Sequence, residues 1–331
     1  MNGDIYKVVT YKEQGVSHQY YGKPCEDHVG EYFDSKSGVV AVAVSDGAGS
    51  YKNAETGSRI TSQKAVQFMA KKFERLYELD EETFADYMLQ EVYAALIEEA
   101  ERNQYDIMSL SATLLVAAMH PDGRYLFFHV GDGAVLAYTT DGEVKILSQY
   151  EHEEAANIAT FVTVPNTDYK MGRGRGDVLS FLLMSDGPEP HVISKEKAVG
   201  RLGLMIQMSF FFSRERMEDE LEGFTELLKQ NNMTDDASFA VLSDKRGVGK
   251  VFGQMDAGFK ELLFGLPLAM KKKTKKNYEG FFGQMAIHPR GMYPKKLCSL
   301  FHIHKNRVLK KKLDGFIYAG VIKKENGRYI F

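Results

Sequence analysis

VVAVAVSDGAGS, residues Val39–Ser50, is the stretch of sequence that decides the fold. Its first six residues are apolar and mostly β-branched, which predicts a strand that is buried on both faces. The strand ends at Asp46, and Gly47 and Gly49 follow, which let the backbone approach a ligand closely. A carboxylate beside an accessible carbonyl oxygen suits a hard divalent cation.

Two later apolar stretches end in the same way. Tyr125–Val130 runs into Asp132, and Val178–Met184 runs into Asp186, each followed by glycine. A single Asp-Gly pair is more often a turn, but three pairs that each follow an apolar strand indicate one shared rim. Two acidic pairs could contribute carboxylates to the same rim. Glu26-Asp27 lies in a predicted turn, and Asp235-Asp236 lies where a predicted strand begins.

The composition is that of a soluble globular protein. The chain has 331 residues, of which 44% are apolar and 26% charged, enough for one large domain and a small one. No apolar run approaches the about 20 residues that cross a bilayer, and the N-terminus lacks a signal-peptide pattern. Cys25 and Cys298 are too few for a disulfide framework and too isolated for a zinc site. We therefore expect a cytoplasmic protein without a membrane partner.

Charge divides the chain into two parts. Residues 1–244 contain 22 Lys and Arg against 40 Asp and Glu, whereas residues 245–331 contain 20 against 5. The net charges are therefore −18 and +15. We expect a domain over 1–244, a basic linker or helical segment over 245–290 and a small domain over 291–331.

Periodic apolar residues predict the layers around the strands. Ala54–Tyr77, Glu82–Arg102 and Val199–Gln230 show helical spacing, and adjacent amphipathic helices suggest a layer packed on a sheet. Residues 148–176 have little apolar periodicity, so we interpret them as a long loop near the rim.

The acidic residues point to one chemistry. Carboxylates and a backbone carbonyl, with no cysteine and no histidine pair nearby, favour Mg²⁺ or Mn²⁺ over zinc or copper. If these carboxylates converge, a cation is expected, because their mutual repulsion would raise their pKa values. Two such ions about 3.5–4 Å apart can orient a water for in-line attack on phosphorus.

Five short motifs carry a family resemblance: VAVSDGAG, SATLLVAAM, HVGDGAVLAY, LLMSDGPEP and TDDASFAVL. Their order and approximate spacing resemble those of the metal-dependent type 2C protein serine/threonine phosphatases, above all their compact bacterial branch. The resemblance covers roughly residues 10–243. It implies the α+β fold class, as a four-layer αββα sandwich with a binuclear Mg²⁺ or Mn²⁺ centre.

The resemblance also assigns roles to the acidic residues. Asp46 would bridge both ions and Gly47 would offer its carbonyl. Glu26 would serve one ion and Asp186 and Asp235 the other, and Asp132 matches the aspartate that holds a weaker third ion in several members. Asp46 and Asp186 would act in catalysis through metal-activated water, which attacks phosphoserine or phosphothreonine of a phosphoprotein substrate.

Two departures from the family pattern affect phosphate handling. Many members have an arginine where this chain has Gly22, and Lys23, Arg173 or Arg175 are candidates to replace it. Ala48 stands where eukaryotic members have a histidine. The alternative function is therefore a catalytically weak or inactive phosphatase-fold scaffold or sensor that acts through its basic C-terminal part.

Pro294–Phe331 predicts a helix, a turn, a second helix and a hairpin, which resembles the last two helices and wing of a winged helix. Lys305, Asn306, Arg307, Lys310 and Lys311 would lie on its second helix, with Arg328 on the wing. Such a segment could dock to protein, within or between chains, or bind nucleic acid, and we favour docking to protein.

Overall fold

The computed structural model describes residues 5–149, 160–194, 197–198, 200–288, 290–303 and 305–331. Contacts between Cα atoms divide it into two compact units. Of the described residues, the first unit consists of Val8–Ile206 and Glu218–Leu242, and the second of residues 5–7, Gln207–Met217 and Ser243–Phe331. No helix in the described part is both long enough and apolar enough to span a membrane.

The first sheet is antiparallel throughout and contains the predicted central strand. Its order is β2 (His28–Phe33), β3 (Val40–Ser45), β4 (Leu114–Met119), β5 (Arg124–Val130) and β8 (Lys170–Arg175). Every residue of β3 is buried, which confirms the predicted double-sided burial. Because β3 lies between β2 and β4, its end carries Asp46 to the rim of the sheet.

The second sheet has the order β1 (Tyr6–Glu13), β12 (Ala237–Asp244), β9 (Val178–Met184), β6 (Ala134–Thr139) and β7 (Val144–Gln149). In the β6–β9 pair, Ala134 lies opposite Met184. That register places the turn before β6 beside the turn after β9, so Asp132 and Asp186 meet at one edge. β9 also packs against β3 and β4, which joins the two sheets face to face.

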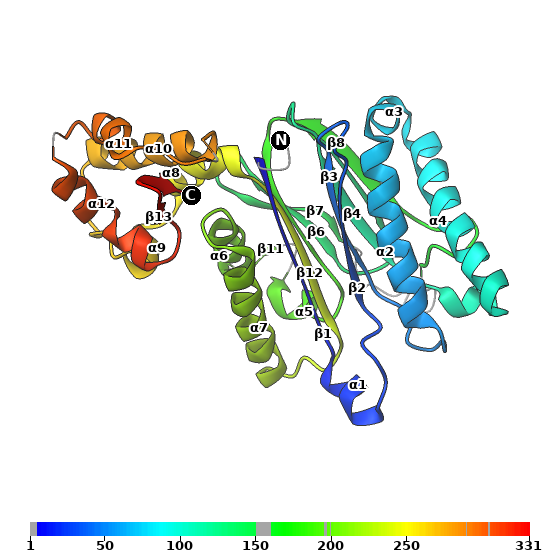
Figure 1. The fold of residues 1–331 in the computed structure, drawn as a ribbon. Coiled ribbons are helices and arrows are strands. Elements are labelled where there is room, and N and C mark those ends of the chain that lie inside the picture. The colour runs from blue at the N-terminus through cyan, green and yellow to red at the C-terminus, as the bar shows by residue number, and fades with distance from the viewer. Residues whose placement is uncertain (1–4, 150–159, 195–196, 199, 289, 304) are drawn as a thin grey trace. The chain divides into compact units, whose positions relative to one another are not determined.

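Helices cover the outer faces of the two sheets (Figure 1). α2 (Ala54–Lys71) packs on β2, β3 and β4, and α4 (Glu81–Asn103) packs on α2, with the short α3 (Phe73–Glu78) between them. The Phe84 and Phe128 rings meet edge to face at 5.7 Å between this layer and the sheet. Each fully buried side chain of this size stabilises the fold by about 1.5–3 kcal/mol.

The helical region predicted over Val199–Gln230 contains two helices, α6 (Gly200–Ser209) and α7 (Arg214–Gln230). The ring centroids of Phe224 of α7 and Phe239 of β12 lie 6.2 Å apart, so α7 packs on the second sheet. The result is the predicted four-layer αββα sandwich. Short elements complete the first unit: α1 (Val16–Tyr21), a 3₁₀ turn η2 (Ile107–Leu110), α5 (Glu189–Val192), β10 (Ile193–Ser194) and β11 (Lys197–Ala198).

Residues 148–176 differ from the loop that was predicted for them. Residues 150–159 lie outside the described part, but Lys170–Arg175 form the edge strand β8. A Cβ at Gly172 would come within 2.3 Å of the Phe127 ring, and one at Gly174 within 2.3 Å of Tyr125. Glycine is needed because aromatic rings of β5 cover these positions. The same glycines interrupt the apolar alternation by which a strand is recognised in a sequence.

The second unit is built around aromatic side chains. Phe252, Phe264, Phe282 and Phe316 have ring centroids 4.8–6.3 Å apart, and Phe211 joins them at 5.3 Å from Phe264. Residues 245–290, expected as a basic linker or helical segment, supply three helices of this core. Its elements are η3 (Lys245–Gly247), α8 (Val248–Gln254), α9 (Ala257–Phe264), α10 (Lys272–Ala286), α11 (Pro294–Leu300) and α12 (Asn306–Tyr318).

The second unit ends in a hairpin of β13 (Lys323–Glu325) and β14 (Arg328–Ile330). Asn326 and Gly327 between the strands have φ of 47° and 75°. Two consecutive positive φ angles characterise the tight turn that Asn-Gly favours. The helices, the turn and the hairpin follow the order that the sequence predicted, and the winged-helix assignment stays a prediction.

Candidate active site

Three of the predicted aspartates converge where strands of both sheets end. Asp46 follows β3, Asp132 lies in the turn between β5 and β6, and Asp186 follows β9. One carboxylate oxygen from each lies within 4.8 Å of the others. The sequence prediction of a shared rim therefore holds for these three residues.

Backbone contacts hold Asp46 in place. Its N–H donates to the Thr113 hydroxyl over 2.9 Å, and its carbonyl accepts from the Thr113 N–H over 2.8 Å. Gly47 pairs with Ala112 as an isolated bridge, and a Cβ on Gly47 would lie 2.4 Å from the Ala54 carbonyl. Residue 47 must therefore be glycine for α2 to begin where it does.

A similar arrangement holds Asp132. The glycines on either side of it, Gly131 and Gly133, have φ of 93° and 92°, which only glycine adopts readily. His129 is fully buried, and its Nε2 lies 3.1 Å from the Asp132 carbonyl oxygen. Burial lowers the pKa of His129 to about 4. His129 is thus a neutral support for the turn.

Asp27 is a residue that sequence reasoning noted but gave no role. Its side chain is 1% exposed, accepts a hydrogen bond from Ser185 Oγ over 2.7 Å and is hydrogen-bonded to Asp46. Burial raises the pKa of Asp27 to about 6. The sequence signal was the Glu26-Asp27 pair, but a pair ahead of a strand does not show which carboxylate points inward.

Asp46 and Asp186 also have raised pKa values. Burial raises the pKa of Asp46 well above its usual range, and the neighbouring Asp27 and Asp186 raise it further. For Asp186, burial is again the first cause, followed by the charge of Asp132. These half-buried carboxylates repel one another, and a divalent cation among them would relieve that repulsion.

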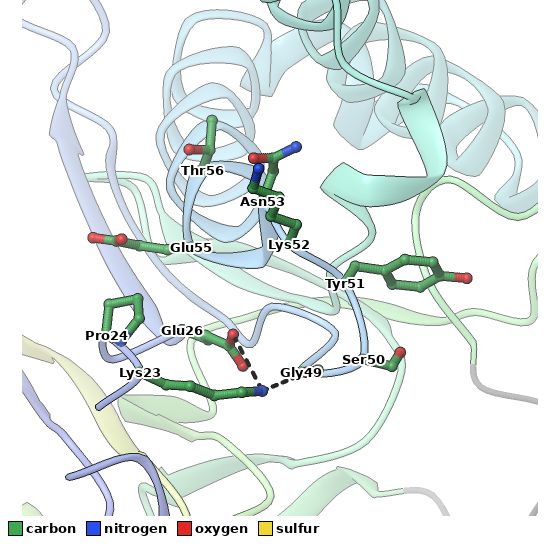
Figure 2. Close-up of a pocket in the computed structure, with 10 residues that line it drawn as sticks. All are labelled: Lys23, Pro24, Glu26, Gly49, Ser50, Tyr51, Lys52, Asn53, Glu55 and Thr56. Atoms are coloured by element: carbon green, nitrogen blue, oxygen red, sulfur yellow. Dashed lines mark hydrogen bonds and ion pairs between the residues drawn. The ribbon is translucent and has the colours of Figure 1, made fainter. Parts of the chain in front are cut away.

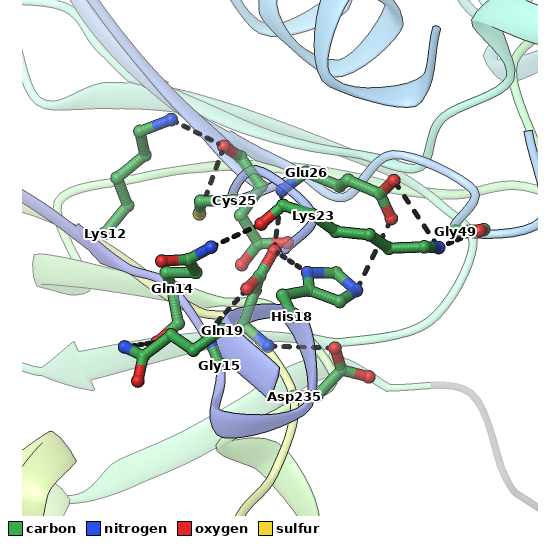
Figure 3. Close-up of polar contacts among 12 residues, drawn as sticks. Lys12, Gln14, Gly15, His18, Gln19, Lys23, Cys25, Glu26, Gly49 and Asp235 are labelled. Atoms are coloured by element: carbon green, nitrogen blue, oxygen red, sulfur yellow. Dashed lines mark hydrogen bonds and ion pairs between the residues drawn. The ribbon is translucent and has the colours of Figure 1, made fainter. Parts of the chain in front are cut away.

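Glu26 is not among the three converging aspartates and lies beside His18 and Lys23 (Figure 3). It is 6% exposed, and its carboxylate lies 3.9 Å from Lys23 Nζ and 3.5 Å from His18 Nε2. Burial raises the pKa of Glu26. Its Oε2 has no hydrogen-bond partner within the described residues.

Asp235 and Asp236 have different surroundings. Asp235 is exposed, whereas Asp236 is 2% exposed and accepts from the N–H groups of Gly15 and Glu26, both over 2.6 Å. Asp236 also lies 2.8 Å from His18 Nδ1. His18, Asp235 and Asp236 each bring one side-chain atom within 4.8 Å of the others. His18 was missed because a lone histidine ahead of the acidic pair belongs to no motif.

The three candidate phosphate-binding cations are not brought together. Lys23 lies beside Glu26 and donates to the Gly49 carbonyl over 2.7 Å. Arg173 and Arg175 lie opposite Leu126 and Arg124 of β5, at the far end of that strand from Asp132. There Arg173 donates to the Tyr77 carbonyl, and Arg175 lies 3.9 Å from Asp122.

A pocket of about 540 Å³ opens beside Glu26 (Figure 2). Lys23, Pro24 and Glu26 line one part of it, and the loop from Gly49 to Asn53 with the first turn of α2 lines the other. The pocket is polar and open, which suits a segment of a protein substrate more than a small apolar ligand.

Comparison with known proteins agrees with this architecture. A family model described as Protein phosphatase 2C matches residues 14–235. A bacterial serine phosphatase structure aligns with TM-score 0.51 and 15% identity over 72% of this chain and 97% of that one. A structure of a bacterial serine phosphatase that bears an arginine-to-alanine mutation aligns with TM-score 0.50 and 16% identity, again over 72% of this chain and 97% of that one. The structure of the Mycobacterium tuberculosis serine/threonine phosphatase PstP/Ppp aligns with TM-score 0.49 and 16% identity over 72% of this chain and 98% of that one. No curated protein sequence matches significantly.

Two sheets packed between helices, with carboxylates converging at the strand ends, define a phosphatase fold of the metal-dependent class. The chain belongs to the protein phosphatase 2C family, whose model spans most of the first unit. It is a protein serine/threonine phosphatase of that family. This confirms the family and the enzyme class predicted from the sequence motifs.

Proposed function

We propose that the chain removes phosphate from phosphoserine and phosphothreonine of a cytoplasmic phosphoprotein with the help of two Mg²⁺ or Mn²⁺ ions. The convergence of Asp46, Asp132 and Asp186 within 4.8 Å is the observation that carries this proposal. The group offers oxygen donors only, which is the ligand type that both ions prefer.

The residues present fit such ions in two further respects. Burial and mutual repulsion hold the pKa values of Asp46 and Asp186 high, so a bound divalent cation would stabilise their charged forms. In addition, the buried Oε2 of Glu26 has no hydrogen-bond partner in the described part of the chain. A carboxylate oxygen in that condition is available as a ligand.

We assign the ligands as the family pattern suggests. Asp46 would bridge the two ions with the Gly47 carbonyl beside it, Glu26 would serve one ion, and Asp186 and Asp235 the other. Asp132 would hold a weaker third ion. When bound, such ions supply a nucleophilic water at neutral pH and neutralise charge on the phosphoryl group. Asp27, hydrogen-bonded to Asp46, would orient the Asp46 carboxylate toward such ions.

A lysine and a histidine beside the cluster would meet the substrate. Lys23 and His18 flank Glu26 at 3.9 Å and 3.5 Å, and Lys23 also lines the pocket. We propose that these two side chains contact the phosphate of the substrate. Their position supports them over Arg173 and Arg175, which contact other groups near the opposite end of β5.

Hydrolysis of a phosphothreonine peptide by the full-length protein, with Mn²⁺, Mg²⁺ or a chelator, tests the function. The chelator should abolish turnover, and Asp46→Asn should lower it by about a thousandfold or more. Asp219→Asn makes the same chemical change at an exposed position of α7 and should stay within about twofold of the native rate.

The alternative function predicts a different result. A folded protein that binds Mn²⁺ but hydrolyses none of a varied panel of phosphopeptides would contradict our proposal. That outcome would favour the catalytically inactive scaffold or sensor. Equal losses in Asp46→Asn and Asp219→Asn would also contradict the assignment of Asp46.

A further inference from the structure

The second unit presents a row of cationic side chains on one helix. α12 buries Leu309, Leu313 and Phe316 against the aromatic core. Lys305, Arg307, Lys310 and Lys311 are exposed, three of them on the N-terminal half of α12 and Lys305 directly before it. We call these four side chains the α12 cationic face.

No ion pair within the described part of the chain compensates this face. None of its four side chains forms an ion pair with any residue that the structure describes. In the first unit, by contrast, Arg102 and Arg124 each pair with two carboxylates. Residues 245–331 carry a net charge of +15, so the face lies within a strongly positive part of the chain. Uncompensated positive charge of this kind attracts polyanions.

The composition of the face argues against an ordinary protein partner. Protein interfaces are depleted in lysine and are organised around buried aromatic or apolar anchors. Here lysine predominates, and the exposed apolar residue in the same half of the helix is Val308, at 42% exposure. The pattern is instead that of contacts to a phosphate backbone, to which lysine and arginine supply most of the binding free energy.

The width of the major groove distinguishes duplex DNA from duplex RNA as a partner for a helix. A helix with its side chains is about 10–12 Å across, which fits the major groove of B-form DNA at about 12 Å but not the narrow one of A-form RNA. The hairpin that follows α12 exposes Lys323 and Lys324 on β13, which adds positive charge after the helix. We propose that the α12 cationic face binds double-stranded DNA, mainly through its phosphates. This binding is independent of the phosphatase activity.

Fluorescence anisotropy with a labelled DNA duplex of about 30 base pairs tests the proposal on the full-length protein. The affinity should fall steeply with salt between about 50 and 300 mM. Lys310→Ala/Lys311→Ala should weaken binding about tenfold or more near 100 mM salt and reduce the salt slope by about two. Alanine favours helix, so α12 should persist, and melting temperature and peptide hydrolysis should not change.

Lys36→Ala/Lys72→Ala is the matched control, because it removes the same charge from exposed positions of the first unit. It should leave the DNA affinity within about twofold. Should the double variant on α12 fail to fold, Arg307→Gln tests the same face with a smaller change. No binding near 50 mM salt, or an equal loss in the matched control, would overturn the proposal. Polyglutamate competing as well as the duplex would assign the face to an acidic protein, and equal affinity for duplex RNA would exclude the groove model.

Discussion

Asp235 and Asp236 are neighbours in the sequence, yet their carboxylates have different partners. Asp236 is buried and accepts from two backbone N–H groups, whereas Asp235 is exposed. Asp236→Asn would place an amide NH₂ where donors already converge, so we predict a loss of about 2–4 kcal/mol in the free energy of unfolding measured with urea. Asp235→Asn should change that free energy by less than about 0.5 kcal/mol.

The same pair separates stability from metal binding. Under the proposed assignment, Asp235→Asn should weaken Mn²⁺ binding in calorimetry while the fold stays intact. If Asp235→Asn destabilised the protein as much as Asp236→Asn, the assignment of a structural role to Asp236 alone would be wrong. The letters Thr-Asp-Asp carry no sign of this difference, because it depends on Gly15 and Glu26, more than 200 residues away.

His18 is the second prediction at this scale. Its Nδ1 lies 2.8 Å from Asp236, and its Nε2 faces Glu26 at 3.5 Å, so the ring has a fixed position beside the cluster. His18→Ala should raise KM for a phosphopeptide by about tenfold and change kcat less, since a ground-state contact to phosphate is lost. His18→Arg should restore part of the affinity, because a guanidinium also donates to phosphate. Unchanged KM in His18→Ala would contradict phosphate contact by this ring.

Among the elements, strands with a strong apolar pattern were predictable and the strand β8 was not. Val39–Val44 reads as a buried strand because every side chain faces a core. Lys170–Arg175 reads KMGRGR, and its pairing depends on the rings of Phe127 and Tyr125 above its glycines. Such packing involves residues that are distant in sequence, so local periodicity does not reveal it.

Glycines in two helices give a matched test at this scale. A Cβ on Gly57 of α2 would lie 2.2 Å from the Leu110 carbonyl oxygen, whereas one on Gly223 of α7 would meet nothing within 4 Å. Gly57→Ala should therefore destabilise the protein by about 1–3 kcal/mol through overpacking. Gly223→Ala should stabilise it by about 0.5–1 kcal/mol, because alanine favours helix. Urea unfolding measures both, and a loss in both variants would contradict this account of the packing.

Across the whole molecule, the change of charge near residue 244 predicts a domain boundary, but charge gives no sign of the upstream segment that joins the second unit. Gln207–Met217 belong to it although they lie far upstream. Phe211 explains this, since its ring lies 5.3 Å from both Phe264 and Phe282. Likewise, strand ends ordered along the chain predicted where Asp46, Asp132 and Asp186 meet, but not which way Glu26 and Asp27 turn, because their contacts arise only in the assembled sandwich.

The burial of Asp27 has a consequence for the stability of the whole protein. Asp27 has a folded pKa of about 6 and an unfolded value of about 3.9, so the folded state binds more protons between these values. Its contribution to stability is therefore present below about pH 4 and lost as the pH rises through about 6.

Without metal, Asp27→Asn should thus raise the melting temperature more at about pH 7.5 than at about pH 5. Mn²⁺ binds the deprotonated carboxylates, so its stabilisation of the native protein should grow over the same interval. Thermal melts at both pH values, with chelator or Mn²⁺ and with Asp219→Asn as control, measure this. A pH-independent effect of Asp27→Asn, together with a pH-independent shift by Mn²⁺, would show that these carboxylates do not form the cation site.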